Sequence, residues 1–293
     1  DRAEAARSET VSRGGNHYRF AIDREGGNAR NELALDSELR QALEHSEFVL
    51  DYHPRVNMES RVMGAEALLR WQSPQRGLVG PAEIIPFAER TGLIIAIGQW
   101  VLHSACTQWQ AWQSQGWSRG LKVSVNLSVH QLEHPDAVNM VARVLEESGL
   151  DPALLELEIT ESAAMNNIDH CIPTLHAFKQ LGVSISIDDF GSGHSSFAYL
   201  KRLPVNALKI DRSFVIDLAQ TYADAAIVAA IITVAHQLKL GAVAEGVTDN
   251  EQVSVLSELG CDEMQGFLFS KPLPAEAFEA FVRERAETSR TPG

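Results

Sequence analysis

The sequence has few cysteines and no long apolar run, and each shortage excludes a class of protein. Its three cysteines, Cys106, Cys171 and Cys261, lie far apart and form no C-x-x-C pair. They offer neither a zinc framework nor a disulfide scaffold, so we expect reduced thiols and a cytoplasmic location. The longest apolar runs, 93–97 and 227–235, fall well short of the roughly 20 residues that a membrane-spanning helix needs.

Basic residues are also scarce relative to acidic ones. The 25 Lys and Arg against 39 Asp and Glu give a formal net charge of −14. DNA and anionic membrane surfaces attract proteins with a basic face, so we predict neither as a partner. An acidic protein still binds an anionic substrate where a metal cation supplies the positive charge. With 45% hydrophobic and 22% charged residues, the composition is otherwise that of an ordinary globular protein.

Strand-like and helix-like segments alternate along most of the chain. Helical stretches separate runs of β-branched residues at 121–126, 154–159, 183–188, 207–210, 241–245 and 263–268. This alternation predicts a parallel sheet, and over about 250 residues the leading architecture is an α/β, TIM-like (β/α)8 barrel. An open, doubly wound sheet is the alternative. No G-x-x-x-x-G-K or G-x-G-x-x-G motif stands at a strand-to-helix turn, which disfavours it.

Several of these strands carry polar side chains at every second position. Glu156 and Glu158 alternate with aliphatic residues, and 122–126 and 183–188 follow the same rule. Because side chains alternate across a strand, each strand has one apolar and one polar face. A half-solvated antiparallel sheet gives the same pattern. The intervening helices, however, must cover the apolar faces, which leaves the polar faces inside the barrel, where a ligand or metal has to satisfy them.

Polar residues also mark the ends of the predicted strands: Glu66, Asn126, Glu158, Asp188, Lys209, Glu245 and Gln265. In a barrel of this kind the carboxyl ends of the strands open onto one face, which carries the active site. With Asp189, five carboxylates would meet one lysine there and repel one another unless divalent cations neutralise them. Oxygen ligands favour Mg²⁺ or Mn²⁺ over zinc, and two such ions recur in enzymes that cleave phosphate esters.

A series of short motifs runs from about Leu39 to Pro274. The motifs are Glu66-Ala67-Leu68 within GAEALLRW, PFAE (86–89), SVNLS (124–128), EITES (158–162), DDFG (188–191), LKID (208–211), AEGV (244–247), QG (265–266) and SKP (270–272). In these residues the chain resembles the EAL-domain phosphodiesterases, which hydrolyse the bacterial second messenger cyclic di-GMP. The resemblance implies a barrel whose first strand runs antiparallel to the rest, and pGpG as the linear product.

The resemblance also implies a centre of two Mg²⁺ or Mn²⁺ ions. One ion would be held by Glu66, Asn126, Glu158 and Asp188. Asp188 would be shared with the second ion, which Asp189 and Glu245 would support. Lys209 would orient or help deprotonate the attacking water. The predicted catalytic residues are Lys209, Glu66, Asp189, Glu245 and Glu161.

Substrate contacts follow from the same resemblance, with one departure. Arg70 would pair with a phosphate, Gln265 would read a guanine edge, and Glu161 would steady the loop that starts at Phe190. The family usually has Tyr-Gln-Pro on its first strand, where this chain has Tyr52-His53-Pro54. His53 therefore stands at a base-contact position, and we expect it to alter substrate affinity.

The chain divides into three predicted segments. Residues 1–35 form a linker or the end of a preceding domain, 36–286 the phosphodiesterase domain, and 287–293 a tail. Because the chain begins without Met, and 11–35 resemble the end of a GGDEF (diguanylate cyclase) domain, we expect a longer parent protein with upstream GGDEF or sensor domains. A homodimer through the EAL domain is the other predicted partner.

Three functions remain open at this point. The first is an active phosphodiesterase, and the second is a receptor that binds cyclic di-GMP without cutting it. Receptors of this type usually lack some metal ligands, whereas this chain keeps all of them. The third is a glycosidase on the same barrel, which needs two carboxylates and no metal. Asn126 and Lys209 fit a glycosidase poorly, and a chelator would separate it from the other two.

Overall fold

The computed structural model describes residues 27–166, 168–192 and 200–288. The chain divides into two compact units, Asp1–Ser46 and Glu47–Gly293. In the first unit, helix α2 (Gly27–Glu44) runs across the predicted 35/36 boundary, and Arg40 pairs with Asp36 one turn before it. Residues 1–26 of the predicted linker and 289–293 of the predicted tail lie outside the described residues. The three predicted segments therefore stay predictions.

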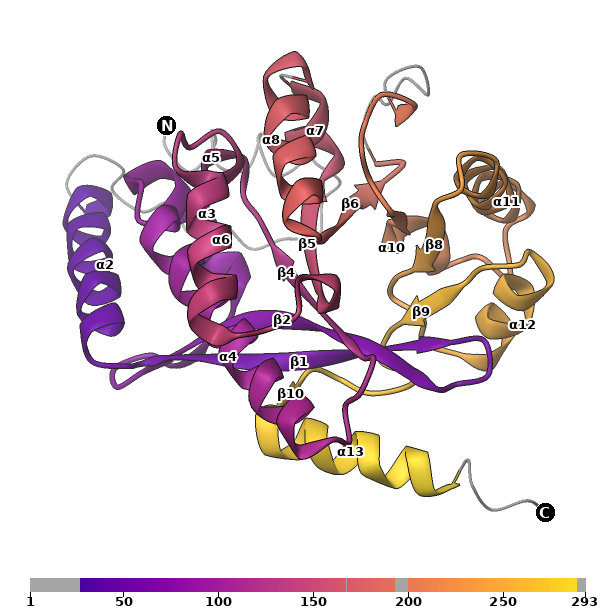
Figure 1. Cartoon of the computed structure of the whole chain (residues 1–293), viewed down its shortest axis with the longest axis horizontal. Coiled ribbons are helices and arrows are strands. Elements are labelled where there is room, and N and C mark those ends of the chain that lie inside the picture. Colours follow the sequence, from indigo (N-terminus) through magenta and orange to yellow (C-terminus); the bar gives the residue numbers. More distant parts are fainter. Residues whose placement is uncertain (1–26, 167, 193–199, 289–293) are drawn as a thin grey trace, which may run out of the picture. The chain divides into compact units, whose positions relative to one another are not determined.

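The second unit is built on a closed barrel of eight strands (Figure 1). Around the barrel the strands are β1 (Phe48–Asn57), β9 (Glu263–Gln265), β8 (Gly241–Ala244), β7 (Ala207–Ile210), β6 (Ser184–Phe190), β5 (Leu155–Thr160), β4 (Lys122–Asn126) and β2 (Val62–Ser73). Strand β2 pairs back with β1 and closes the ring. Strand β1 is antiparallel to both of its neighbours, whereas the other neighbouring strands pair in parallel. The predicted TIM-like barrel with an antiparallel first strand is confirmed.

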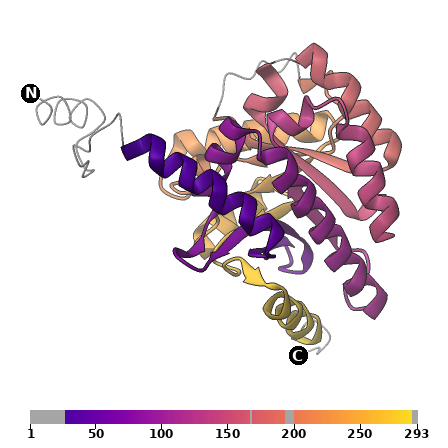
Figure 2. The same ribbon diagram turned by 90° about the vertical axis from the view of Figure 1, so that its left-hand side faces the viewer.

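Two short strands extend the sheet, and helices lie on the outside of the barrel (Figure 2). Strand β3 (Gly77–Val79) pairs with β2, and β10 (Leu273–Pro274) pairs with β1. The helices are α3 (Pro81–Thr91), α4 (Ile94–Gln115), α5 (Val129–Leu132), α6 (Ala137–Ser148), α7 (Glu161–Asn166), α8 (Ile168–Leu181), α10 (Arg212–Val215), α11 (Tyr222–Gln237), α12 (Asn250–Glu258) and α13 (Ala275–Thr288), with a 3-10 turn at Pro152–Leu154. None of the described helices is long and apolar enough to cross a membrane.

Side chains of β1 point alternately to the outside and to the inside of the barrel. Tyr52 points outward, where its ring packs against Trp109 and Trp112 of α4 and Phe278 of α13 at centroid distances of 4.9–6.1 Å. Its neighbour His53 consequently points the other way, into the barrel. This aromatic cluster holds the strand that carries His53 and so contributes to the position of groups inside the barrel.

The barrel interior is polar, as the period-2 pattern predicts. Glu156 and Glu158 of β5 are 3% and 1% exposed, and Lys209 of β7 is fully buried. Ser124 and Ser186, on the neighbouring strands, are also fully buried. A half-solvated sheet would leave these side chains in contact with water. Their burial shows instead that the helices cover the apolar faces and that the polar faces meet one another inside.

The three cysteines are packed in the second unit. Cys106, Cys171 and Cys261 are all free and buried. Burial raises the pKa of the Cys106 and Cys261 thiols to about 12 in each case. Buried thiols with raised pKa values are unreactive, so their role is in packing.

Candidate active site

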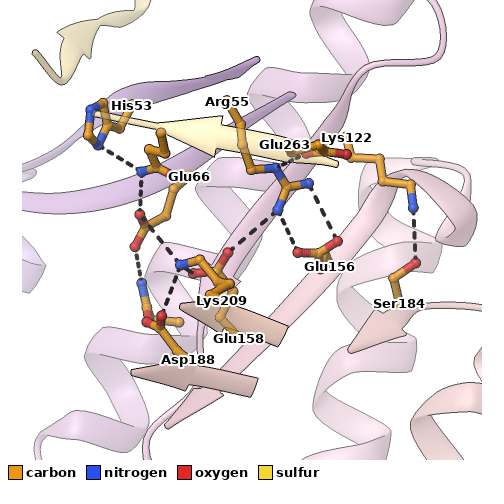
Figure 3. A network of polar contacts seen from close by, with 12 residues as sticks. His53, Arg55, Glu66, Lys122, Glu156, Glu158, Ser184, Asp188, Lys209 and Glu263 are labelled. Atoms are coloured by element: carbon orange, nitrogen blue, oxygen red, sulfur yellow. Dashed lines mark hydrogen bonds and ion pairs between the residues drawn. The ribbon is translucent and has the colours of Figure 1, made fainter. Parts of the chain in front are cut away.

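Lys209 stands in the middle of four carboxylates at the carboxyl end of the barrel. Figure 3 shows it with three of them, Glu66, Glu158 and Asp188. Its Nζ lies 2.5 Å from Glu158 Oε2, 2.6 Å from Glu245 Oε1 and 3.2 Å from Asp188 Oδ1. Glu66 Oε2 is 3.9 Å away. These acids lie on, or directly after, different strands, because parallel barrel strands end on the same face. The structure thus brings together residues that the sequence separates by up to 179 positions (245 − 66).

One lysine does not neutralise these acids, and the pKa values reflect the excess of negative charge. Burial, reinforced by the neighbouring Asp188 carboxylate, raises the pKa of Glu245 to about 7 and that of Asp189 to about 6. Burial also holds the pKa of Glu158 well above its usual value, even beside Lys209. Burial alone would lower the pKa of Lys209, but the carboxylates around it, Glu158 foremost, raise it well above normal. The lysine therefore stays charged, and a further cation would be stabilised here.

Strand β6 turns both aspartates near its carboxyl end toward the cluster. On a regular strand, Asp188 and Asp189 would point to opposite faces. The β6–β7 register instead shifts between Ile187 and Phe190, and Asp189 has a φ of 53°, a left-handed conformation that Asp tolerates better than most residues. As a result, Asp188, Asp189 and Glu245 offer carboxylate oxygens within 4.8 Å of one another. Such a group suits a hard divalent cation.

The donor set also fits a metal at Glu158. Glu158 Oε1 is buried and has no hydrogen-bond partner among the described residues. A buried carboxylate oxygen without a partner is costly, and an ion would satisfy it. Asn126 uses the nitrogen of its amide to donate to Glu66 Oε1 at 2.6 Å, not its carbonyl oxygen. These observations support a metal site.

Gln265 links Glu66 to His53. Its Nε2 donates to Glu66 Oε2 at 2.8 Å and lies 2.7 Å from His53 Nδ1. The other ring nitrogen, His53 Nε2, lies 3.1 Å from the carbonyl oxygen of Ser270. Burial lowers the pKa of His53, so the ring is neutral near pH 7. Gln265 itself is only 3% exposed, and its predicted contact with a guanine edge stays a prediction.

Arg70 and Glu161 lie outside this cluster. Arg70 follows Glu66 by four residues on β2, and its Nε pairs with Asp51 at 2.9 Å. Its predicted contact with a substrate phosphate stays a prediction. In that contact the Arg70 guanidinium would bind the phosphate either in place of Asp51 or together with it. Glu161, at the start of α7, is 2% exposed and accepts a hydrogen bond from the Gly191 amide at 2.7 Å. This is the type of contact that the loop-steadying role requires, although 193–197 of that loop lie outside the described residues.

A second charged group lies deeper in the barrel, and the sequence analysis missed its centre. Arg55 is 2% exposed, with Nη1 2.6 Å from Glu156 Oε1 and Nε 2.8 Å from Glu263 Oε2 (Figure 3). Its Nη1 also lies 3.9 Å from Glu158 Oε1, so Glu158 is flanked by Lys209 and Arg55. A signal was available, because polar residues recur at every second position from Asp51 to Asn57.

Comparison with known proteins decides the family. Residues 36–272 match the model of a family described as "EAL domain". The chain belongs to the EAL domain family. The predicted family is thereby confirmed.

This EAL domain is 46% identical over 281 residues to the bifunctional diguanylate cyclase/cyclic di-GMP phosphodiesterase MucR of Pseudomonas aeruginosa, covering 96% of this chain and 41% of MucR. It is 39% identical over 251 residues to the cyclic di-GMP phosphodiesterase PdeR of Escherichia coli, covering 86% of this chain and 38% of PdeR. The chain thus spans about two fifths of the length of these two relatives. A solved structure of the PaMucR phosphodiesterase in complex with c-di-GMP matches with a TM-score of 0.81 and 47% identity, covering 84% of this chain and 99% of that one.

Proposed function

We propose that this EAL domain hydrolyses cyclic di-GMP to linear pGpG in a reaction that depends on two divalent metal ions. The observation that carries the proposal is the buried carboxylate cluster around Lys209, with oxygens of Asp188, Asp189 and Glu245 within 4.8 Å of one another. Relatives named cyclic di-GMP phosphodiesterases, MucR and PdeR, support the substrate and the reaction. A complete set of oxygen donors favours an enzyme over a receptor that only binds.

In this proposal each residue of the cluster has a defined task. The ions, Mg²⁺ or Mn²⁺, would be held by Glu66, Asn126, Glu158, Asp188, Asp189 and Glu245. Such ions, when bound, lower the pKa of a water molecule and neutralise charge on phosphoryl oxygens. Lys209, charged and fully buried, would orient the attacking water and balance the carboxylates. Arg70 would hold a substrate phosphate through its guanidinium group, which suits the geometry of phosphate oxygens.

A cavity beside the cluster supports a nucleotide as the substrate. Its volume is about 560 Å³, within the range of small-molecule sites. Leu68, Pro86 and Ile94 give it apolar walls, while Asn126 and Glu89 contribute polar groups. Because Asn126 is also a proposed metal ligand, a phosphate held at the cluster would bring its attached base within reach of the cavity. Apolar walls with a few polar groups suit a purine base.

The decisive experiment incubates the chain with cyclic di-GMP and Mg²⁺ or Mn²⁺ and follows pGpG by chromatography. We expect product with either ion, none in excess EDTA, and recovery when Mn²⁺ is restored. Ca²⁺ should inhibit, because its longer and looser coordination changes the spacing of the ligands. Binding of cyclic di-GMP without product would contradict the enzyme and leave the receptor. Full activity in EDTA would contradict the metal mechanism.

The predicted assembly belongs to the same proposal. The relatives are longer than this chain, and the name of MucR includes a diguanylate cyclase, which supports upstream domains in a parent protein. The homodimer rests on the family resemblance alone. The cytoplasmic location is supported by three buried, free cysteines.

Glu161→Gln is expected to lower kcat by about tenfold, the lower end for groups that orient metal ligands. Glu161 holds the Gly191 amide, two residues after Asp189, so a weaker charge-assisted bond would let Asp188 and Asp189 shift. The Mg²⁺ concentration for half-maximal activity should rise, and excess Mg²⁺ should restore part of the rate. Thermal stability should stay close to that of the unmodified protein. Exposed Glu146→Gln is the control, and an inactive Glu161→Gln that binds Mg²⁺ normally would mean that Glu161 acts on the substrate.

A further inference from the structure

A network of hydrogen bonds connects Glu66, Gln265, His53 and Ser270, and the Gln265 amide donates in both directions, to Glu66 and to His53. These directions follow from donor and acceptor chemistry. The Glu66 carboxylate only accepts, so the Gln265 group that faces it must be the NH₂. The second hydrogen of that NH₂ faces His53 Nδ1, which must then be an acceptor. The proton of the neutral ring therefore sits on Nε2, which donates to the Ser270 carbonyl oxygen.

This hydrogen-bond network includes one of the two amide groups that hold the Glu66 carboxylate. Asn126 of β4 donates to Oε1 at 2.6 Å, and Gln265 of β9 donates to Oε2 at 2.8 Å. Gln265 Oε1 is buried and has no hydrogen-bond partner within the described part of the chain. The orientation of this amide is therefore set by its NH₂ group alone, through His53 and Glu66. Without an acceptor at His53, the amide keeps only one of the two contacts that fix its NH₂ group, so it is held less firmly against the Glu66 carboxylate.

We propose that His53 is a positioning residue that acts on Glu66 through Gln265 and makes no polar contact with the substrate. This inference deepens the proposed function and rests on it, since Glu66 matters as a proposed metal ligand. Both ring nitrogens of His53 are occupied by protein groups, so neither is left for a base edge. The ring also lies 6.0 Å from the Phe267 ring, centroid to centroid. On this proposal, changes at His53 alter metal affinity, whereas the family resemblance predicts a direct effect on substrate affinity.

Three substitutions of His53 distinguish the role of Nδ1 from that of Nε2. His53→Asn keeps an acceptor, Oδ1, near the position of Nδ1. His53→Gln puts its amide near the position of Nε2 and removes the acceptor that faces Gln265. His53→Phe removes both nitrogens and keeps a ring next to Phe267. Exposed His103→Phe serves as the matched control.

The primary measurement is the Mn²⁺ dissociation constant of the whole chain without substrate, by calorimetry or electron paramagnetic resonance. We expect His53→Phe and His53→Gln to raise it about tenfold, as for other groups that orient metal ligands, and His53→Asn to stay close to the unmodified value. With cyclic di-GMP, kcat should fall at limiting Mn²⁺ and recover at saturating Mn²⁺, while KM stays unchanged. In a Gln265→Met background, His53→Phe should have no further effect on Mn²⁺ binding, because the path through Gln265 is already cut.

Each contrary result has a definite meaning. A raised KM with unchanged Mn²⁺ affinity would overturn the proposal in favour of a direct substrate contact. An equal loss in His53→Asn and His53→Phe would overturn the role of the Nδ1 acceptor. If His53→Phe fails to fold, the comparison of His53→Asn with His53→Gln decides the question. If the unmodified chain binds Mn²⁺ but forms no pGpG, the proposed function fails, and the Mn²⁺ titrations alone decide the role of His53.

Discussion

Replacing Lys209 with methionine is expected to abolish hydrolysis of cyclic di-GMP and to make the stability of the fold depend on divalent metal. Lys209 is fully buried, and four carboxylates lie within 3.9 Å of its Nζ. Without it the acids keep their burial and lose their counterion. We expect kcat to fall by about 10² or more with little change in KM, because a residue that orients the water acts in the transition state.

The stability of the same variant provides an independent test. Without metal, the free energy of unfolding should fall by about 3–5 kcal/mol, the usual cost of removing one partner of a buried ion pair. Added Mn²⁺ should then stabilise the variant more than the unmodified protein, because the ion replaces the lost positive charge. Urea denaturation with and without Mn²⁺ measures both effects, and exposed Lys201→Met is the control. If Lys209→Met instead raises KM and leaves kcat unchanged, Lys209 binds the substrate and does not orient the water.

The metal-free variant should also respond more steeply to pH. In the folded protein the pKa of Glu245 is about 7 and that of Asp189 about 6, both above their usual values of 4.5 and 3.8. The folded state therefore binds more protons than the unfolded state, and stability falls as the pH rises through this range. Because Lys209 lowers both pKa values, its removal raises them and steepens the fall.

Arg55→Met is expected to destabilise the fold by about 3–5 kcal/mol, since it leaves the buried Glu156 and the partly buried Glu263 without their cation. The ion pair between Arg55 and Glu156 is buried, whereas Arg283 and Glu279 form an ion pair on the protein surface, one helical turn apart. Arg283→Met should cost at most about 1 kcal/mol, as surface ion pairs do. The free energy of unfolding in urea measures both variants.

A second substitution tests the cause of that loss. Glu156→Gln removes one of the unpaired charges, so Arg55→Met combined with Glu156→Gln should recover part of the stability. Equal losses for Arg55→Met and Arg283→Met would show that the buried cluster is not held together by Arg55. Because Arg55 also lies 3.9 Å from Glu158, its removal leaves that carboxylate with less positive charge beside it, and added Mn²⁺ should restore part of the lost stability.

The architecture and most of the candidate site could be predicted from the sequence. Period-2 polarity in Glu156 and Glu158, between stretches of helical periodicity, already implied a barrel with a polar interior. The ends of parallel strands share one face, so residues such as Asn126 and Lys209 were expected to meet. The alternating polarity is repeated along the chain, and the shared face of the strand ends follows from strand direction. Neither property depends on which side-chain atoms are in contact.

Only the tertiary structure decided how these groups are oriented. Asp188 and Asp189 share one site because a register shift and a positive φ interrupt the alternation of β6, and no residue pattern marks such a bulge. Arg55 meets Glu156 across 101 positions of sequence, and Gln265 meets His53 across 212. Such contacts depend on the register between β1 and its neighbours and on which atom donates each hydrogen bond. Side-chain periodicity specifies the face of a strand but not the partner across the barrel, which is determined only when the ring of strands closes.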